Sequence, residues 1–384
     1  MTDSGNGEHL YIGLMSGTSI DAIDSAIVEY KDGTPTLRAT REHSIPQKTR
    51  DRITEISARG DDEIERLGRL DRELGILFGD AALALLQEAK VEASDITGIG
   101  SHGQTICHRP PSALAHPDQS FTLQIGDPNT IAERTGITTV ADFRRRDIAA
   151  GGEGAPLAPG FHAAIFAQHG INRAIVNIGG IANASILRGT QLLAGYDTGP
   201  GNTLLDNWIL KQCGRPYDRN GHWAAGGDVN VPLLQMLLGH PYFMQTGPRS
   251  TGKEDFNLLW LNECLTSLSA ITTQDIQATL AELTAISIVK GIASSGVKIE
   301  EVYVCGGGAH NTDLMRRLSK QLMPTVLDST AAIGLDPDWV EAVAFAWLAR
   351  QTLEHLAGNA PVVTGATGPR ILGGIFPGNR GLRA

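Results

Sequence analysis

The sequence MSGTSIDAID, at residues 15–24, stands between two apolar runs, residues 11–14 and 26–28. Two strand-like runs joined by a segment of Gly, Ser, Thr and Asp predict a β-hairpin, and its turn exposes backbone N–H groups and hydroxyls. Such a turn can bind phosphate, because successive backbone amides form an anion-binding nest. The alternative is a polar turn without a further role, since the same residue types are common in turns.

Five residues of this turn carry the phosphate interpretation. Gly17 lets the backbone approach an anion closely, and Thr18 and Ser19 add hydrogen-bond donors. Asp21 and Asp24 are too acidic to bind phosphate directly. The natural role of either carboxylate is therefore to hold a hydrated magnesium ion beside the phosphate.

The same pattern returns twice. RAIVNIGGIANAS, at residues 173–185, places a Gly-Gly turn between apolar runs and flanks it with Asn177 and Asn183. EVYVCGGGAHN, at residues 301–311, ends a strand-like run in three glycines and leads into a helical stretch. Three strand-to-glycine turns in one chain indicate that one nucleotide is held from several sides.

The length and charge of the chain limit the classes of partner. With 384 residues, the chain is long enough for two domains with substantial cores. Its 42 acidic and 32 basic residues give a net charge of -10, and no basic block interrupts the sequence. These features argue against nucleic acid and against an anionic membrane surface as partners.

The cysteines and the chain start favour the cytoplasm. Cys107, Cys213, Cys264 and Cys305 stand far apart and lack paired ligand spacing, which predicts reduced thiols and neither a disulfide frame nor a zinc site. The first ten residues have no basic start and no apolar h-region, and no later apolar run is long enough to span a bilayer.

Residues 51–92 predict a pair of helices packed on a sheet, because apolar residues recur every three or four positions. A short strand is predicted at residues 96–103, and His102 and Gln104 stand at its exit. Polar side chains at such a position commonly line the cleft of an α/β fold, so both are expected substrate contacts. The alternative for His102 is a capping or core residue, which is the commoner role of a lone histidine.

Three arginines and an aspartate, residues 144–147, follow a strand predicted at residues 137–141 and meet a glycine-rich loop at residues 151–159. In a net acidic protein, arginines at a strand exit suit an anionic ligand such as a carboxylate. The alternative is a solvated charge cluster. The loop is the expected hinge or domain boundary.

GYDTGPGN, at residues 195–202, places Asp197 after a strand and before a tight turn built by Gly199, Pro200 and Gly201. Asp197 has no basic neighbour in sequence and no helix partner within reach. An acid in this setting suits a general base that takes a proton from an attacking hydroxyl or water. The alternative is that Asp197 only braces the turn through backbone amides.

GPRSTGKE, at residues 247–254, matches the Walker A spacing up to Lys253. Glu254 then replaces the Ser or Thr that would bind magnesium, and no strand precedes the segment. We therefore expect a loop at a cleft edge, with Lys253 near phosphate, and not a P-loop.

Two Asp-Pro pairs are typical of helix starts. Asp127-Pro128 opens a predicted helix that Gly136 closes, and Asp336-Pro337 is expected to cap a long helix with Glu341 in its first turn. Glu341 either interacts favourably with the helix dipole or binds sugar hydroxyls. A further helix is predicted at residues 276–292.

Seven motifs along residues 11–377, in this order, resemble the anhydro-N-acetylmuramic acid kinase family. They are MSGTSIDAID, SHGQTICHRP, ADFRRRDIAAGGEGAPLAPGFH, NIGGIANAS, GYDTGPGN, RSTGKEDFN and VCGGGAHNTDLM. The family belongs to the superfamily of sugar kinases, heat-shock ATPases and actin, in which two similar domains close on ATP. The resemblance implies an α/β, two-domain actin-like ATPase fold, a duplicated mixed sheet flanked by helices, with a central cleft.

The expected domains are residues 9–143, with segment 360–384 packing back on them, and residues 144–359. The first carries the first phosphate turn. The second carries the second phosphate turn, the catalytic aspartate and the nucleoside loop.

The resemblance also implies site residues. Asp197 matches the catalytic aspartate, Asp21 is the expected magnesium ligand, and Arg146 and Glu341 match positions in the sugar pocket. The full set of expected substrate contacts is His102, Gln104, Arg146, Asp147 and Glu341. The expected nucleotide contacts are Gly17, Thr18, Ser19, Ile20, Asp21, Ala22, Ile23, Asp24, Gly179, Gly180, Asn183, Gly306, Gly307, Gly308 and Asn311.

The implied reaction uses ATP and Mg²⁺. Water opens the anhydro bridge of 1,6-anhydro-N-acetylmuramic acid while ATP phosphorylates the oxygen on carbon six, giving N-acetylmuramic acid 6-phosphate and ADP. Asp197 would activate the water. The γ-phosphoryl group would capture the departing bridge oxygen and so replace the general acid that a glycosidase needs.

The first turn departs from the family pattern, with Ala22 where Gly is typical and Ile20 where Leu is common. We expect Ala22 to shift the start of a strand without abolishing binding. Two alternatives remain: a kinase of the same superfamily that acts on another sugar or on a carboxylic acid, and a non-catalytic, nucleotide-dependent sensor of cell-wall fragments. Homodimerisation is a family expectation.

Overall fold

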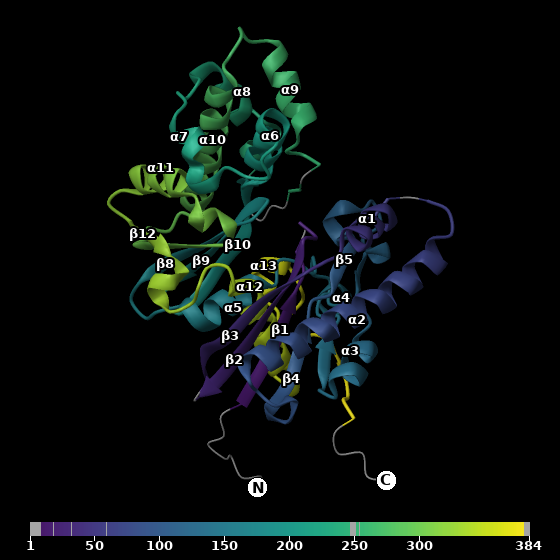
Figure 1. Cartoon of the computed structure of the whole chain (residues 1–384). Coiled ribbons are helices and arrows are strands. Elements are labelled where there is room, and N and C mark those ends of the chain that lie inside the picture. Colours follow the sequence, from purple (N-terminus) through teal and green to yellow (C-terminus); the bar gives the residue numbers. More distant parts are fainter. Residues whose placement is uncertain are drawn as a thin grey trace. The chain divides into compact units, whose positions relative to one another are not determined.

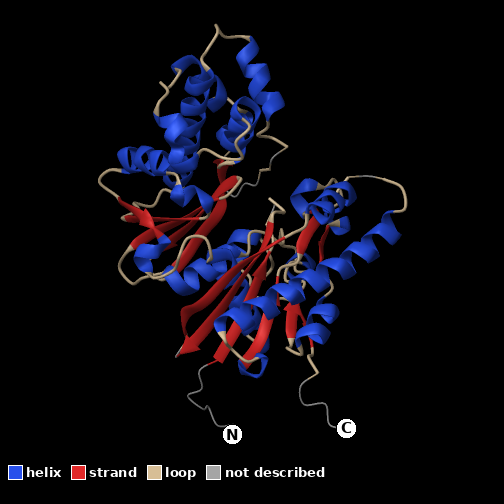
Figure 2. Cartoon of the chain, in the orientation of Figure 1, coloured by secondary structure: helices blue, strands red, loops and turns tan. Residues whose placement is uncertain are grey.

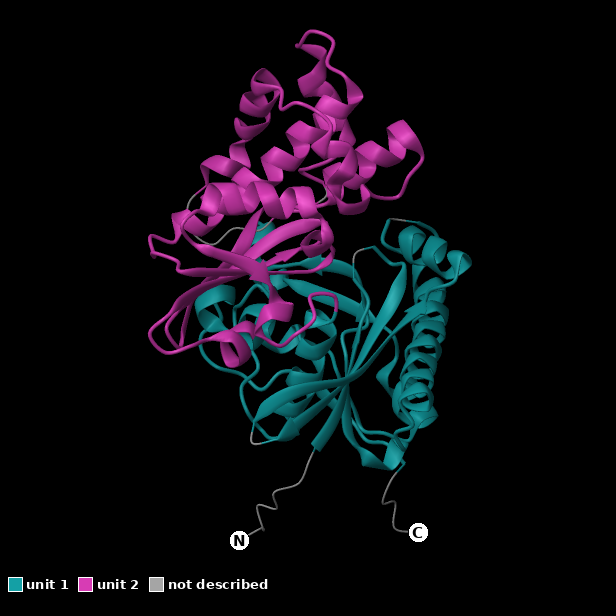
Figure 3. Cartoon of the chain, turned by 60° about the vertical axis from the view of Figure 1, so that its left-hand side comes forward, with its two compact units in different colours: residues 1–161, 339–384 teal, residues 162–338 magenta. Residues whose placement is uncertain are grey.

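The structure is a computed structural model that describes residues 9–379 apart from 18, 32, 59, 246–250 and 253. The chain divides into two compact units (Figure 3), one formed by Met1–Phe161 with Trp339–Ala384 and the other by His162–Asp338. The chain enters the second unit within α5 (Ala158–Phe166) and returns immediately before α12 (Val340–Leu353).

Unit 1 is built on a six-stranded mixed sheet in the order β13-β7-β4-β1-β2-β3 (Figures 1 and 2). β1, β2 and β3 form an antiparallel meander, β4 and β7 run parallel to β1, and β13 returns antiparallel to β7. The strands are β1 (His9–Met15), β2 (Ala22–Lys31), β3 (Thr34–Ser44), β4 (Ile96–Ser101), β7 (Thr139–Ala141) and β13 (Gly374–Phe376). The predicted hairpin at residues 15–24 is confirmed, with Met15 paired to Asp24.

The two faces of this sheet carry different helices. Ile12 and Leu14 of β1 lie in one apolar cluster with Leu74 and Phe78 of α2 (Glu63–Ala89). Gly13 points the opposite way, because successive residues of a strand alternate between faces. The helices on the first face are α1 (Gln47–Ile56), α2 (Glu63–Ala89) and α3 (Pro128–Thr135). The predicted helix pair over residues 51–92 is therefore confirmed.

α12 lies on the other face in backbone contact with two strands. A Cβ added at Gly13 would stand 1.8 Å from the carbonyl oxygen of Ala342, and one at Gly100 would stand 2.0 Å from that of Phe345. This close approach makes α12 part of unit 1. The compact units thus differ from the expected boundaries at 143/144 and 359/360, since residues 144–161 and 339–359 pack with unit 1.

Unit 2 repeats the topology of unit 1. Its five-stranded sheet has the order β10-β9-β8-β11-β12, again an antiparallel meander followed by two parallel strands. The strands are β8 (Asn172–Ile178), β9 (Ile181–Arg188), β10 (Gln191–Pro200), β11 (Glu301–Cys305) and β12 (Val326–Ser329). The predicted α/β fold with a duplicated mixed sheet is confirmed.

The remaining helices of unit 2 build a second apolar cluster around α10 (Thr273–Ser294). They are α6 (Thr203–Cys213), α7 (His222–Ala225), α8 (Val231–Leu238) and α9 (Leu258–Thr266), and α11 (Thr312–Leu322) follows β11. Among the described helices, only α10 is long and apolar enough to cross a membrane, and 72% of its apolar window is buried inside the protein. That burial is typical of a core helix.

Short elements complete unit 1. These are the two-stranded sheet of β5 (Gln104–Arg109) and β6 (Phe121–Ile125), with α4 (Arg145–Ala149) and α13 (Pro361–Thr364). The predicted caps of α3 are confirmed, because the Asp127 carboxylate accepts from the N–H groups of Asn129 and Thr130 and Gly136 closes the helix with φ of 69°.

The predicted cap at Asp336-Pro337 is wrong. α12 begins three residues after Pro337, at Val340. The Asp336 carboxylate accepts instead from the N–H of Asp338, and the Pro337 carbonyl accepts from the N–H of Gly306. These bonds form a separate turn tied to the triple-glycine loop. The prediction that Glu341 lies in the first turn of the helix is confirmed.

Candidate active site

The turn between β1 and β2 holds a strained backbone. The N–H of Ile20 donates to the Gly17 carbonyl, and Ile20 has φ of 59°, which is rare for a β-branched residue. Ser19 Oγ and the N–H of Ala22 both donate to Oδ1 of Asp21, at 2.5 and 3.1 Å. Such strain persists only where the surroundings hold it, and it is often found at ligand sites. Thr18 lies outside the described residues.

Asp21 is the exposed acid of this turn, and its second oxygen, Oδ2, receives no hydrogen bond from the part of the chain that is described. Asp24 lies farther along, in β2, opposite Glu42 of β3. Within the described residues, no group of three His, Cys, Asp or Glu side chains could enclose a metal ion.

His102 follows β4 and is held by Arg144. Its N–H donates to the Leu14 carbonyl at 2.9 Å, and its ring lies against Phe345 with centroids 4.8 Å apart. Arg144 donates to Nε2 of His102 from Nη2 at 2.9 Å and from Nε at 3.2 Å. Because Nε2 accepts, the ring proton is on Nδ1.

Burial and the Arg144 charge together lower the pKa of His102 to about 3, so the ring is neutral. Nδ1 is buried, and no group among the described residues bonds to it. Burial also lowers the pKa of Arg144 to about 10, while the carboxylates of Glu341 and Asp147 act in the opposite direction. Arg144 therefore links His102 to two acids of unit 1.

Two residues expected to contact the substrate are buried and form hydrogen bonds within the protein. The Gln104 side chain is 2% exposed, and its oxygen accepts from Ser16 Oγ at 2.7 Å. Asp147 is fully buried: Oδ2 accepts from the N–H of Gly154, and Oδ1 accepts from the side chains of Asn359 and Thr364. The geometry thus gives both residues structural bonds, and Asp147 fixes the glycine-rich loop.

Arg146 and Glu341 are exposed. Arg146 projects from α4 into a pocket of about 380 Å³ in unit 1. Glu341, at the start of α12, lies close enough to Arg144 to raise its pKa. Arg144, which the sequence did not single out from its two neighbours, is therefore the arginine that joins His102 and Glu341.

In unit 2, the strand register aligns the polar residues. Asn177 of β8 pairs with Asn183 of β9, and Asn183 pairs with Asp197 of β10. Directly opposed residues on neighbouring strands place their side chains on the same face of a sheet. Asn177, Asn183 and Asp197 therefore form one row, and Cys305 of β11 pairs with Asn177 on its other side.

Asp197 is braced from two segments. Its carbonyl accepts from the Tyr242 hydroxyl at 2.6 Å, and Oδ2 accepts from the N–H of Thr251 at 3.0 Å. The expected tight turn after Asp197 differs in form: β10 continues to Pro200 through a bulge between Asp197 and Gly199, and Gly199 has φ of 143°. Residues 247–250 and Lys253 of the GPRSTGKE segment lie outside the described residues, but the N–H of Thr251 places this segment beside Asp197.

The second and third glycine turns touch one another. The carbonyls of Gly179 and Gly180 accept from the N–H groups of residues 201–203. A Cβ at Gly306 would stand 2.3 Å from Oδ1 of Asn177, and one at Gly308 would stand 2.3 Å from the Ile178 side chain. Only glycine fits at both positions without a shift of the backbone or of these neighbours.

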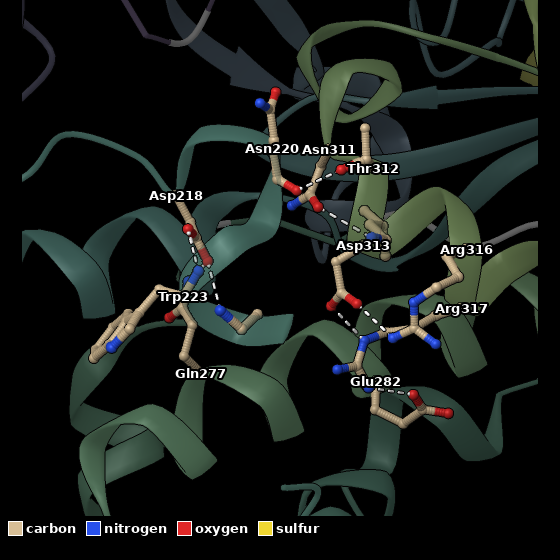
Figure 4. A network of polar contacts seen from close by, with 12 residues as sticks. Asp218, Asn220, Trp223, Gln277, Glu282, Asn311, Thr312, Asp313, Arg316 and Arg317 are labelled. Atoms are coloured by element: carbon tan, nitrogen blue, oxygen red, sulfur yellow. Dashed lines mark hydrogen bonds and ion pairs between the residues drawn. The ribbon is translucent and has the colours of Figure 1, made fainter. Parts of the chain in front are cut away.

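Asn311 has a structural role next to this loop. Its Oδ1 accepts from the N–H of Leu314 and caps α11. Figure 4 shows Asn311 beside Asn220, whose carbonyl accepts from the Thr312 hydroxyl. In the same network, Arg317 pairs with Asp313 and Glu282, each at 2.7 Å. These contacts fix the start of α11 behind the triple glycine.

A model of the anhydro-N-acetylmuramic acid kinase family matches residues 9–378. The chain belongs to this family. A relative of this name from Saccharophagus degradans is 49% identical over 369 residues, which cover 96% of this chain and 98% of that protein. Another, from Shewanella sp. strain MR-4, is 49% identical over 95% of this chain and 98% of its own length.

Solved structures are much less similar to this chain in sequence. Component A of (R)-2-hydroxyglutaryl-CoA dehydratase from Acidaminococcus fermentans is 13% identical, covers 90% of this chain and 99% of its own, and has a TM-score of 0.49. A ROK family glucokinase from Streptomyces griseus, in complex with glucose and AMPPNP, is 14% identical, covers 89% and 99%, and has a TM-score of 0.39.

In this anhydro-N-acetylmuramic acid kinase family member, three residues that hold the candidate site have no signal in the local sequence. Arg144 was one of three consecutive arginines, and only the fold separates their directions. Tyr242 and Thr251 lie 45 and 54 residues from Asp197 in sequence. No local sequence pattern indicates a hydrogen bond between residues so far apart in the chain.

Proposed function

We propose that this chain is an ATP-dependent kinase that opens the 1,6-anhydro ring of 1,6-anhydro-N-acetylmuramic acid and phosphorylates the oxygen on carbon six. The products are N-acetylmuramic acid 6-phosphate and ADP, and the reaction serves the recycling of cell-wall peptidoglycan in the cytoplasm. Family membership supports the reaction class. The observation that carries the mechanism is Asp197, an acid braced at Oδ2 and at its carbonyl and aligned with two asparagines.

Asp197 is the proposed general base. It takes a proton from water, whose oxygen bonds to the anomeric carbon as the bond from that carbon to the bridge oxygen breaks. The bridge oxygen attacks the γ-phosphorus, and the bond between the γ-phosphorus and ADP breaks. Because the phosphoryl group takes the leaving oxygen, one catalytic carboxylate suffices. The N–H of Thr251 keeps this carboxylate from rotating away from the water, and the Tyr242 hydroxyl fixes the backbone that carries it.

The glycine turns are the proposed nucleotide contacts. The turn after β1 offers Gly17 and Ser19, and the turn after β8 offers Gly179 and Gly180, so each unit contributes one phosphate turn. Gly306, with Gly307 and Gly308, supports the nucleoside. Asn183, beside Asp197 in the register, supplies an amide toward the phosphates.

The residues present fit a magnesium ion held mainly by phosphate and water. Asp21 keeps one carboxylate oxygen unengaged by the described residues, and Mg²⁺ often takes only one or two protein carboxylates. When bound, the ion supplies charge neutralisation at the β- and γ-phosphates. Asp21 would orient it from the turn, and Ser19 and Ala22 would hold Asp21.

The sugar contacts proposed for unit 1 are Arg146 and Glu341, with His102 and Arg144 behind them. The neutral His102 ring accepts from Arg144 at Nε2 and so positions this arginine. Glu341 accepts hydrogen bonds from sugar hydroxyls, and Arg146 meets the acid group of the substrate. Gln104 and Asp147 support this set from inside the protein.

The test is a coupled ADP-release assay with magnesium, ATP and 1,6-anhydro-N-acetylmuramic acid, in which the mass of the sugar product is also determined. The wild type should release ADP and form a phosphorylated, ring-opened sugar. Asp197→Asn should lower kcat by about 10²-fold or more, because it removes the base. Asp228→Asn, an exposed acid of the same unit, is the matched control and should retain activity.

Each contrary result has its own meaning. ADP release without a ring-opened product would assign the chain to another substrate of the superfamily. Nucleotide and sugar binding without turnover would assign it to a sensor. Full activity of Asp197→Asn would remove Asp197 as the base.

A further inference from the structure

The turn between β1 and β2 is anchored at both of its ends. Ser16, its first residue, is 1% exposed, and its Oγ donates to Oε1 of Gln104 at 2.7 Å. At the other end, the carbonyl of Asp21 accepts from the N–H of Ile45 at 2.9 Å. Ile20, with φ of 59°, lies between these anchors. Because a strained backbone persists only where its surroundings hold it, the anchors are the bonds expected to hold this turn.

Gln104 is itself held in one orientation. It is 2% exposed and follows Gly103, where an added Cβ would stand 2.6 Å from the carbonyl oxygen of Ile125. The Nε2 of Gln104 donates to the Thr105 carbonyl at 3.2 Å. Because a carbonyl only accepts, this bond assigns the nitrogen to that side of the amide and leaves Oε1 facing Ser16. Gln104 therefore presents a fixed acceptor to the turn.

The Ser16 hydroxyl has a single proton, and this proton is donated to Gln104. The hydroxyl is therefore not a donor for a phosphate, and its effect on a bound nucleotide passes through the backbone at Gly17, the next residue. A backbone bond runs beside this pair, from the N–H of His102 to the Leu14 carbonyl at 2.9 Å. The exits of β1 and β4 are thus joined twice, and a buried polar pair with satisfied partners fixes one arrangement of the segments it joins.

We propose that the hydrogen bond from Ser16 to Gln104 positions the turn after β1 for the phosphates of the nucleotide. Ser16 and Gln104 are then positioning residues of phosphoryl transfer, and neither side chain touches ATP. The inference rests on the proposed function, in which this turn binds phosphate. It gives Gln104 a role toward the nucleotide, in addition to its place behind the sugar contacts.

The test measures the Kd of AMPPNP with magnesium and the Kd of 1,6-anhydro-N-acetylmuramic acid by calorimetry, together with the KM for ATP and unfolding in urea. The proteins are the wild type, Ser16→Ala, Gln104→Leu and the double variant. Leucine is close to glutamine in size and has no polar atom, so Gln104→Leu removes the acceptor without opening a large cavity.

Thr135→Ala is the matched control. Thr135 is 6% exposed, and its Oγ1 donates to the Ile131 carbonyl at 2.8 Å. It is the last residue of α3 and precedes β7, so it lies toward the amino ends of the parallel strands of unit 1. The turn lies at their carboxyl ends. Thr135→Ala should lower the stability of unit 1 and bind AMPPNP like the wild type.

Ser16→Ala should weaken AMPPNP binding and raise the KM for ATP about fivefold, as expected for the loss of one hydrogen bond, and should change the Kd of the sugar less than twofold. Gln104→Leu should weaken AMPPNP binding to a similar extent. The double variant should add little to either single variant, because each change breaks the same bond.

Stability should follow a different order from nucleotide binding. Each single variant leaves one buried polar partner unpaired, whereas the double variant leaves neither, so the double variant should be at least as stable as either single one. If a single variant does not fold, the double variant still carries the test and should show the same fivefold weaker binding of AMPPNP.

Several results would overturn the proposal. These are unchanged AMPPNP binding in the folded variants, equal weakening of nucleotide and sugar binding in Ser16→Ala, and fully additive losses in the double variant. Equal weakening is the result of a general loss of folding, which a purely structural bond would produce. A wild type that binds no AMPPNP would contradict the proposed function itself, and this inference with it.

Discussion

At the scale of single residues, burial and the charge of Arg144 together keep His102 neutral. His102 has an ordinary pKa of 6.5, which burial and Arg144 lower to about 3. Arg144→Gln keeps a donor for Nε2 but removes the positive charge, and the acids near Arg144 then favour the imidazolium. The His102 pKa should rise from about 3 but stay below 6.5, because burial still disfavours the imidazolium, so the neutral ring should be lost at a higher pH than in the wild type. We predict a new acidic limb in the pH profile of kcat/KM for Arg144→Gln.

The wild type should show no such limb from His102 above about pH 4, because its pKa is about 3. Arg144→Lys is the matched control, since it retains the charge. The NMR titration of the His102 ring proton provides a readout independent of turnover. An unchanged His102 titration in Arg144→Gln would contradict the role of Arg144.

The sequence predicts a residue of the candidate site where the pattern of its immediate neighbours places it at the end of a strand. His102 was expected at a strand exit, and it directly follows β4. Asp197 was expected after a strand but lies within β10, and its row with Asn177 and Asn183 depends on register. Which of the arginines at residues 144–146 points into the protein depends on how the start of α4 packs. Those are tertiary properties, which residue spacing alone does not contain.

At the scale of elements, the contact between α12 and the first sheet depends on two glycines. A Cβ at Gly100 would meet the Phe345 carbonyl, a backbone atom that moves only with the helix. Gly100→Ala should therefore lower the free energy of unfolding by about 1–3 kcal/mol. Urea denaturation measures this change.

Gly68→Ala provides the matched control for this prediction. Gly68 lies in α2, is exposed, and has no atom within 4 Å of an added Cβ. Its replacement should raise the free energy of unfolding by up to about 1 kcal/mol, because alanine is the better helix former. If Gly100→Ala left the free energy of unfolding unchanged, the packing of α12 would not depend on this close approach.

At the scale of the whole molecule, the sequence predicts the duplicated sheet better than the division into units. Each three-stranded meander is local in sequence, so its glycine turns and apolar runs reveal it. The membership of α12 is not local, because this helix follows unit 2 in the chain and packs on β1 and β4 of unit 1. Its burial on nearly all sides also removes the amphipathic stripe that would indicate a partner.

The discontinuity of unit 1 leads to a prediction about truncation. Ten of the fourteen residues of α12 are buried, and β13 closes one edge of the sheet of unit 1. A chain ending at Asp338 loses both elements and exposes an apolar sheet face, while unit 2 keeps every residue from His162 to Asp338. Limited proteolysis should therefore digest unit 1 and leave a resistant fragment of unit 2. As the control, a chain ending at Asn379 should resist proteolysis like the full chain. Equal resistance of both units in the chain ending at Asp338 would show that unit 1 does not need its returning segment.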